Sequence, residues 1–215
     1  MKSLVNNIRF ILVRIYRGVY LFRLLGVMGK INILFYKVLF PNLFFGKSPC
    51  VWGSFYVMMY DPKASKINFG DNIHMVSDFR RSGITLFSPC KFTTMAQGLI
   101  DIGDNVQLNG VCITSRKSVK IGSGTLVAPN CIIVDSNFHV TWPPENREGP
   151  NALSDDREVL IGENVWIGMN VTILKGSIIG NNSIISAGSV VTGEIPPNVI
   201  ASGNPAEVVK TFGCN

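Results

Sequence analysis

The sequence predicts an all-β fold, a parallel β-helix with a helical N-terminal segment. Branched apolar residues recur every six positions from Ile161 to Val191, and shorter stretches repeat the same pattern from Phe69 onward. All of the excess positive charge lies within residues 1–60. With 215 residues, of which 47% are hydrophobic and 16% charged, the chain has the length of one domain and can fill a core, which excludes a disordered protein.

The N-terminal segment, residues 1–60, is predicted to be helical, basic and apolar. It holds eight of the 20 Lys and Arg residues and none of the 14 Asp and Glu residues, so residues 61–215 carry a net charge of −2. A nucleic-acid groove needs basic residues on the folded body, so we expect no nucleic-acid partner. Basic residues interrupt the apolar run between Leu4 and Phe45 too often for a transmembrane helix or a secretory signal, which favours a cytoplasmic protein.

Two interpretations of this segment stay open. In the first, one or two helices cap the end of the domain or pack against a neighbouring subunit. In the second, residues 1–45 make a peripheral contact with the anionic inner face of the cytoplasmic membrane. The second is suggested by Arg23, Lys30 and Lys37, which share one face of a helix that is otherwise largely apolar.

The cysteines predict free thiols in a reducing compartment. They are Cys50, Cys90, Cys112, Cys131 and Cys214. Their number is odd and no two of them form a Cys-x-x-Cys pair, so neither a disulfide framework nor a zinc site is expected. We expect buried thiols and no bound metal.

The β-helix is predicted to span residues 61–205, followed by a short tail at 206–215. One branched side chain in six can point inward if each hexad forms a short strand and a corner. Three hexads then close one coil of about 18 residues, and stacked coils bury ladders such as Ile167 over Ile185. The in-phase positions are Ile161, Ile167, Ile173, Ile179, Ile185 and Val191. Pro196, Pro197 and Pro205 mark the end of the repeat.

The repeat is interrupted once in an informative way, by a predicted excursion loop at residues 135–158. Ile133 and Ile161 are both in phase, but the 27 residues between them exceed one coil. The loop is polar and rich in proline, so it is expected to leave the prism. His139, one of only two histidines, lies at its base, where an imidazole can exchange a proton near neutral pH.

The chain resembles the hexapeptide-repeat acyltransferases. The resemblance rests on Ile-Gly-Glu-Asn-Val-Trp-Ile-Gly-Met-Asn-Val-Thr-Ile-Leu-Lys-Gly from residue 161, Ser-Ala-Gly-Ser-Val-Val-Thr from 186, and Ile-Pro-Pro-Asn-Val-Ile-Ala-Ser-Gly-Asn-Pro-Ala from 195. Within this family the chain is most similar to bacterial sugar O-acetyltransferases that modify lipopolysaccharide and capsule. The resemblance implies a left-handed β-helix, a homotrimer with active sites between neighbouring chains, and acetyl-CoA as acyl donor. Neither the handedness nor the trimer follows from the period of six.

The resemblance also implies roles for single residues. His139 completes the family pattern Asp-x-(Asp/Asn)-x-His and would be the general base. The backbone N–H of Met169 would stabilise the oxyanion, and Trp166 would lie beside the acceptor and the cofactor, unless it only covers a corner. Asp135 either orients His139 or caps a turn. Asn109 either binds the acceptor or only occupies a tight corner.

The pantetheine arm of acetyl-CoA is expected in a groove of small residues, because small side chains let a narrow arm approach the backbone. By resemblance these residues are Ala187, Gly188, Ala201, Ser202 and Gly203. Corners of a β-helix favour small residues in any case, which is the alternative explanation. Many relatives have a lysine where this chain has Gly193. Whatever that lysine contributes to CoA binding is expected to be absent or supplied by Lys210.

The resemblance thus implies transfer of an acetyl group from acetyl-CoA to a hydroxyl group of a surface glycan, by direct attack. That glycan would be a lipopolysaccharide O-antigen, a capsular polysaccharide or a precursor. One alternative is an N-acetyltransferase acting on a nucleotide-linked amino sugar, and another is a non-catalytic β-helix. A γ-type carbonic anhydrase is excluded because it binds zinc through three histidines, whereas this chain has only His74 and His139.

Overall fold

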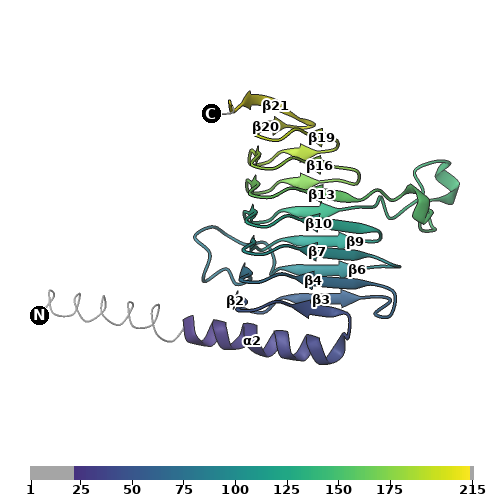
Figure 1. The fold of residues 1–215 in the computed structure, drawn as a ribbon. Coiled ribbons are helices and arrows are strands. Elements are labelled where there is room, and N and C mark those ends of the chain that lie inside the picture. Colours follow the sequence, from purple (N-terminus) through teal and green to yellow (C-terminus); the bar gives the residue numbers. More distant parts are fainter. Residues whose placement is uncertain (1–21, 214–215) are drawn as a thin grey trace, which may run out of the picture.

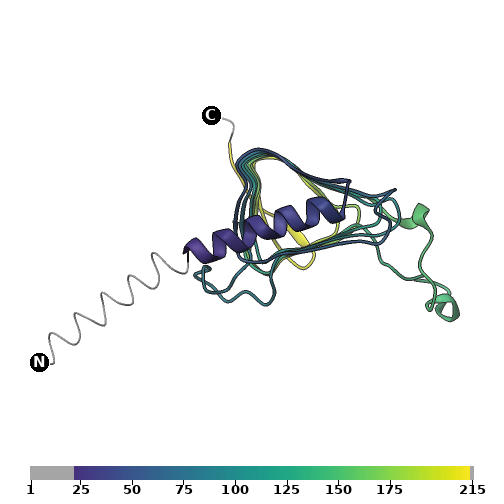
Figure 2. The same cartoon turned by 90° about the horizontal axis from the view of Figure 1, so that it is seen from below.

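The structure is a prism of three β-sheets with one helix across its N-terminal end (Figure 1). This computed structural model describes residues 22–213. Seen along its axis, the prism has a triangular outline (Figure 2). Successive turns of the chain contribute one short strand to each sheet in rotation, and nearly all neighbouring strands are parallel, which confirms the predicted parallel β-helix.

The three sheets are named here in the order in which the chain enters them. The first sheet consists of β1 (Leu43–Phe45), β4 (Lys66–Phe69), β7 (Leu99–Ile102), β10 (Ser118–Ile121), β13 (Val159–Ile161), β16 (Ile178–Ile179) and β19 (Glu194–Ile195). The second consists of β2 (Cys50–Trp52), β5 (His74–Val76), β8 (Gln107–Asn109), β11 (Leu126–Val127), β14 (Trp166–Ile167), β17 (Ile184–Ile185), β20 (Val199–Gly203) and β21 (Ala206–Thr211). The third consists of β3 (Tyr56–Met59), β6 (Lys91–Thr94), β9 (Cys112–Ser115), β12 (Ile132–Val134), β15 (Thr172–Ile173) and β18 (Val190–Val191).

Ladders of branched side chains fill the interior of the prism, as the period of six predicts. Ile167 pairs in register with Ile185, and neither side chain is exposed to solvent. Ile173 and Val191 form the equivalent pair in the third sheet and are also fully buried. Each inward residue therefore packs on its counterparts in the coils above and below, which removes its apolar surface from water.

The sharp corners of the prism depend on residues in the left-handed backbone region. The corner between the first and second sheets carries five such asparagines, and asparagine tolerates this region better than other residues with a side chain. They are Asn72, Asn105, Asn164, Asn182 and Asn198, with φ between 55° and 61°. Stacked asparagines also bond to each other: the Nδ2 of Asn72 donates to Asn105 at 3.2 Å, and that of Asn182 to Asn198 at 3.0 Å.

Helix α2 (Phe22–Leu39) closes the N-terminal end of the prism, as the capping interpretation predicts (Figure 2). Leu25 and Tyr36 are buried on its inner face, and the aromatic ring of Tyr36 packs against Phe55. The helix lies so close to β2 that any side chain at Gly29 would collide with the carbonyl of Val51. Within residues 22–213, no helix is long and apolar enough to span a membrane. Any second helix before residue 22 lies outside the described residues.

The β-helix is longer at both ends than the expected span of 61–205. Strands β1, β2 and β3, at residues 43–59, already form its first coil, because Leu43, Val51 and Val57 point inward like the later ladder residues. Residues 206–211, expected to belong to a short tail, form β21, which turns back antiparallel to β20. The helical part of the N-terminal segment therefore ends at Leu39.

The repeat is interrupted twice rather than once. The expected excursion loop leaves the prism between β12 and β13, and a second loop at residues 77–90 leaves it between β5 and β6 on the opposite side (Figure 1). Buried residues on either side, Val76 and Cys90, keep the coil intact around this second loop. The loop is not marked by a polar composition, since Phe79, Ile84 and Phe87 are all exposed.

The cysteines only partly follow the expectation of buried thiols. Cys90 and Cys131 are buried, and desolvation raises the pKa of each thiol to about 11. Cys50, in contrast, is exposed, because it lies on the outer face of β2, and Cys112 is partly exposed. Cys214 lies outside the described residues.

Candidate functional site

His139 stands in the excursion loop, at the corner between the third and first sheets. Its Nδ1 lies 2.9 Å from the carbonyl oxygen of Arg147 across the loop. A carbonyl can only accept a hydrogen bond, so Nδ1 must carry the proton and donate it. The lone pair of the neutral ring is then on Nε2. The loop thus fixes the tautomer that a general base requires.

Asp135 anchors the loop. Its buried carboxylate accepts hydrogen bonds from the Ser115 hydroxyl at 2.7 Å and from the backbone N–H groups of Arg116, Lys117 and Ser118 at 2.7–2.9 Å. These donors form the corner of the preceding coil. These contacts match the turn-capping alternative for Asp135. The group that orients His139 is the backbone carbonyl of Arg147.

A second anchor, absent from the sequence-based candidates, holds the C-terminal part of the loop against the corner of the preceding coil. The Arg116 guanidinium bonds to the side chain and the carbonyl of Asn151 and lies 3.5 Å from the Asp156 carboxylate. All three side chains are buried, and Asn151 also donates to Asp156 at 2.8 Å. Buried and mutually paired charges hold a loop in one conformation. Only the position of Arg116 next to a corner could have marked it in the sequence.

Two hollows meet at His139. One, of about 480 Å³, is polar and is formed by residues of the loop and of the next coil: Asn137, His139, Thr141, Ser154, Arg157 and Lys175 among them. The other, of about 420 Å³, is lined by residues of earlier coils and the loop base: Tyr60, Met95, Arg116, Phe138, His139 and Pro150 among them. The imidazole therefore borders space large enough for a sugar-sized group on either side.

The predicted oxyanion donor lies at the corner between the second and third sheets. The N–H of Met169 has no hydrogen-bond partner among the residues that the structure describes, whereas its carbonyl accepts from Gly188 at 2.9 Å. In the coil below, the equivalent position is Pro129, which has no N–H at all. An unpaired backbone donor on a rigid turn is the group that oxyanion stabilisation needs.

The other predicted acceptor and cofactor residues lie near this corner. Trp166 is 54% exposed on the outer face of β14. Asn109, the last residue of β8, lies two strands below β14 in the same sheet, and its Nδ2 donates to the Val127 carbonyl at 3.1 Å. The left-handed residue after β8 is Gly110, with φ of 51°, so Asn109 itself does not make the turn.

The expected pantetheine groove is formed only in part by exposed side chains. Ala187 and Gly188 are exposed at the corner, and Gly203 is exposed with φ of 112°, a conformation that suits glycine. Ala201 faces the interior and is fully buried, so its side chain cannot touch a cofactor. Ser202 is partly exposed. Lys210 is exposed on β21, with its Nζ 5.5 Å from the ring of Phe212.

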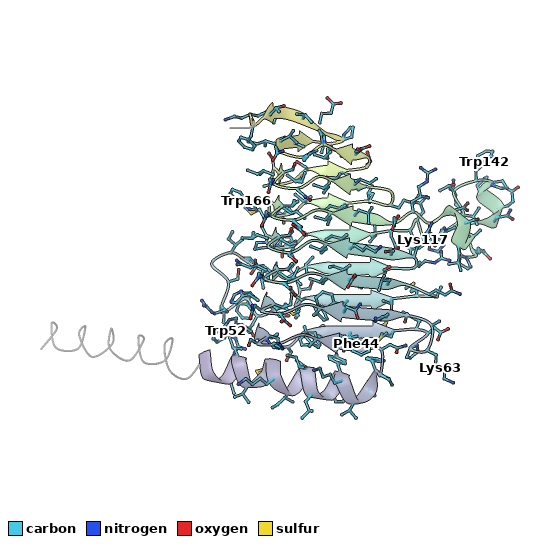
Figure 3. All side chains as sticks on the ribbon, in the orientation of Figure 1. Phe44, Trp52, Lys63, Lys117, Trp142 and Trp166 are labelled. Carbon is cyan, nitrogen blue, oxygen red and sulfur yellow. The ribbon has the colours of Figure 1, made fainter. Side chains whose placement is uncertain are left out.

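A single chain does not bring the two halves of the predicted site together. His139 belongs to the excursion loop at one corner, and Trp166 and Met169 lie at another. Figure 3 shows Trp166 on one side of the prism and Trp142, which stands in the excursion loop, on the opposite side. Within the described residues, no three His, Cys, Asp or Glu side chains gather as a metal site.

Comparison with known proteins gives consistent matches. Residues 158–193 match the family model described as bacterial transferase hexapeptide (six repeats). WbbJ of Escherichia coli (strain K12), named as a candidate lipopolysaccharide biosynthesis O-acetyl transferase, is 35% identical over 187 residues, which cover 84% of this chain and 85% of WbbJ. Galactoside O-acetyltransferase of the same strain is 42% identical over 113 residues, about half of each chain.

Solved structures share the fold. AntD, an N-acyltransferase from Bacillus cereus, in complex with dTDP-4-amino-4,6-dideoxyglucose and coenzyme A, superposes with a TM-score of 0.63 over 85% of this chain and 89% of its own, at 17% identity. A galactoside acetyltransferase in complex with coenzyme A superposes with a TM-score of 0.50 at 26% identity, over 79% of this chain and 65% of its own.

Proposed function

The chain belongs to the hexapeptide-repeat transferase family, and from that premise we propose that it moves an acetyl group from acetyl-CoA to a hydroxyl group of a bacterial surface glycan. The prism is the left-handed β-helix of an acetyltransferase, and acetyl-CoA is its acyl donor. The glycan would be a lipopolysaccharide O-antigen, a capsular polysaccharide or a precursor of either. The observation that carries the proposal is the tautomer of His139, held by the Arg147 carbonyl so that Nε2 is free to take a proton.

The chemistry needs a base and an oxyanion donor. A hydroxyl group is a weak nucleophile at neutral pH, so Nε2 of His139 removes its proton as the oxygen attacks the thioester carbonyl. The Met169 N–H donates to the oxyanion that forms. When the tetrahedral adduct collapses, the C–S bond breaks, and the proton held by His139 passes to the departing CoA sulfur. No covalent intermediate with the enzyme is involved.

The active site is proposed to form between two chains of a homotrimer. The separation of His139 from Met169 and Trp166 within one chain supports this, since neither half carries out the reaction alone. A repeated head-to-tail contact closes into a ring when the rotation between subunits allows it. Each chain would then supply its excursion loop to the corner of the next, and a trimer would hold three identical sites.

The corner of the second and third sheets is proposed to hold the donor and the acceptor on opposite sides of Met169. Ala187, Gly188, Ser202 and Gly203 lie in coils toward the C-terminal end, and the pantetheine arm would run along them, with Ala201 acting only as buried packing. The acceptor would then lie toward the N-terminal end, beside Trp166 and Asn109. Lys210, which is exposed on the final strand, would meet the far end of CoA.

The type of bond formed separates the proposal from its main rival. AntD, which acts as an N-acyltransferase, shares the fold, so an amine acceptor is the alternative. We expect label from acetyl-CoA to appear on free or lipid-linked glycans, and to be released by mild alkali, which cleaves esters but leaves amides. The measurement is an incubation with a panel of free glycans, lipid-linked glycans and nucleotide-linked amino sugars. Alkali-stable label confined to the amino sugars would contradict O-acetylation.

A peripheral contact with the cytoplasmic membrane through α2 is also proposed. The outer side of the helix presents one apolar stripe at helical spacing: Leu24, Val27, Ile31, Leu34, Phe35 and Val38, each more than half exposed. Lys30 and Lys37 border this stripe, and α2 contains no acidic residue. An apolar stripe edged by lysine suits an anionic bilayer surface.

The membrane proposal predicts that Leu34→Glu with Val38→Glu releases the protein from anionic vesicles. Both side chains are highly exposed, so the fold should tolerate the change. Deleting the whole helix would instead remove the buried Leu25 and Tyr36 and expose the core that they cover. The measurement is flotation with vesicles of phosphatidylglycerol and phosphatidylethanolamine. Leu153→Glu, which makes the same kind of change in the excursion loop, serves as the control. Equal flotation of all three proteins would leave α2 with its capping role alone.

A further inference from the structure

An apolar groove lies between α2 and the first coil of the prism. It has a volume of about 480 Å³ and is lined mainly by Gly26, Val27 and Ile33 of the helix and by Cys50, Val51 and Trp52 of β2. A Cβ at Gly26 would lie 3.9 Å from the Trp52 ring, which is ordinary contact distance, so only a longer side chain at this position would fill the groove. This volume is in the range of sites that bind small organic ligands.

Two cations border the groove. Lys30 lines it directly, and the guanidinium of Arg81, from loop 77–90, lies 5.1 Å from the Trp52 ring. The one acidic residue of that loop, Asp78, is engaged by Arg80 at 2.7 Å, and this hydrogen bond lowers the pKa of Asp78. An apolar groove with positive charge at its edge is complementary to a molecule that combines a hydrocarbon chain with an anionic group.

The Trp52 ring is held in a fixed orientation. Its Nε1–H donates to Nε2 of His74 at 3.2 Å. Burial, and then the charge of Arg81, lower the pKa of His74, which keeps it a neutral acceptor. The aromatic wall of the groove is therefore set by contacts within the protein and does not depend on a ligand to order it.

The groove opens on the same face of the prism as the proposed acceptor site. Trp52 pairs in register with Val76, which pairs with Asn109, so Trp52 and Asn109 stand on one line across the strands. Two strand steps separate them, or about 10 Å, and four steps separate β2 from β14, or about 19 Å. Figure 3 shows Trp52 and Trp166 on one side of the prism, and Lys63 on the other.

We propose that this groove binds the lipid chain, and Arg81 with Lys30 the phosphate, of an acceptor glycan carried on a long-chain lipid phosphate. The inference rests on the proposed function and names the form of its substrate. The glycan would extend from the phosphate along the second sheet to Asn109 and Trp166, a distance of a few sugar units. The exposed apolar stripe of α2 lies next to the groove, so a lipid could enter it from the membrane surface.

The test uses farnesyl pyrophosphate as a soluble lipid phosphate, with farnesol and inorganic pyrophosphate as its separate parts. Titration calorimetry on the full chain should show binding of farnesyl pyrophosphate that is at least tenfold tighter than that of either part. Gly26→Leu, which fills the groove, and Arg81→Glu, which reverses the charge at its edge, should each weaken binding at least tenfold. Gly26→Ala and Lys63→Glu, the matched controls, should leave it unchanged.

Two results would overturn the inference. One is the absence of farnesyl pyrophosphate binding, as expected if residues 1–21 or a second copy of the chain fill the groove. The other is binding that pyrophosphate alone reproduces and that Gly26→Leu leaves intact, because a free phosphate site would then account for it. Transfer of acetyl to a lipid-free glycan should be the same in all four variants. If the unaltered protein transfers no acetyl group to any glycan, with or without a lipid, that result would instead contradict the proposed function.

Discussion

Replacing His139 by Ala should lower the turnover of acetyl transfer about 10²-fold or more while leaving the affinity for CoA nearly unchanged. The imidazole is the only group in the proposed mechanism that removes the hydroxyl proton. It stands in the excursion loop, whereas the small residues proposed for the pantetheine lie at a different corner of the prism. Steady-state kinetics with a glycan acceptor, together with calorimetric titration of CoA, measure the two quantities separately.

A variant in the same loop controls for disturbance of the loop itself. Glu145 is exposed in the short 3-10 turn Pro144–Asn146, which contains no buried residue. Glu145→Ala should retain normal turnover, because it alters neither the anchors of the loop nor the imidazole. Near-normal turnover in His139→Ala would remove His139 as general base. A large loss of CoA affinity in that variant would mean that the histidine holds the donor instead.

The period of six predicts a parallel β-helix, though not its handedness, because each ladder position is decided by a single inward side chain. Ile167, Ile173 and Ile185 had to be apolar to fill a narrow core, and they are fully buried. The corners are marked in the sequence by a second signal, asparagine, which the period of branched residues does not include. Asparagine at positions such as Asn164 and Asn182 is a conformational requirement, since both residues have positive φ.

The departures from the prediction have physical causes. The first coil is not evident from the sequence, because Leu43 and Val51 lie within a segment so rich in apolar residues that inward positions do not stand out. Loop 77–90 does not stand out in the sequence, because it carries large apolar side chains that are exposed to solvent. Phe87, for example, is 80% exposed. Apolar residues predict burial only where a regular element gives them a common direction.

Residue roles were harder to predict than the fold, because they depend on contacts between distant parts of the chain. Asp135 and His139 are four residues apart, yet the aspartate bonds to residues 115–118 and the histidine to Arg147. The Met169 N–H is a candidate oxyanion donor because it has no hydrogen-bond partner among the described residues, and no sequence pattern predicts that property. The two proposed halves of the site lie at different corners of the prism, so only contact between two chains would bring them together.

Mixing two inactive variants should restore activity if the site is shared between chains. Met169→Pro removes the proposed oxyanion donor, and Pro129 occupies the equivalent position one coil below, so the corner can accommodate proline. Loss of one such donor typically costs about 10²–10³ in turnover. Met169→Ala keeps the N–H and should remain active. His139→Ala and Met169→Pro thus disable opposite halves of the proposed site.

The recovered activity depends on the number of chains in the ring. In a trimer that contains both variants, only one of the three contacts joins an intact His139 loop to an intact Met169 corner. Co-expression with two tags and purification on both should therefore give about one third of normal activity per oligomer, against about 1% or less for each variant alone. Recovery of about one half would indicate a dimer and contradict the trimer. No recovery at all would mean that each chain assembles its own site. His139 would then have to reach Met169 within one prism, although the two residues lie at separate corners of the described chain.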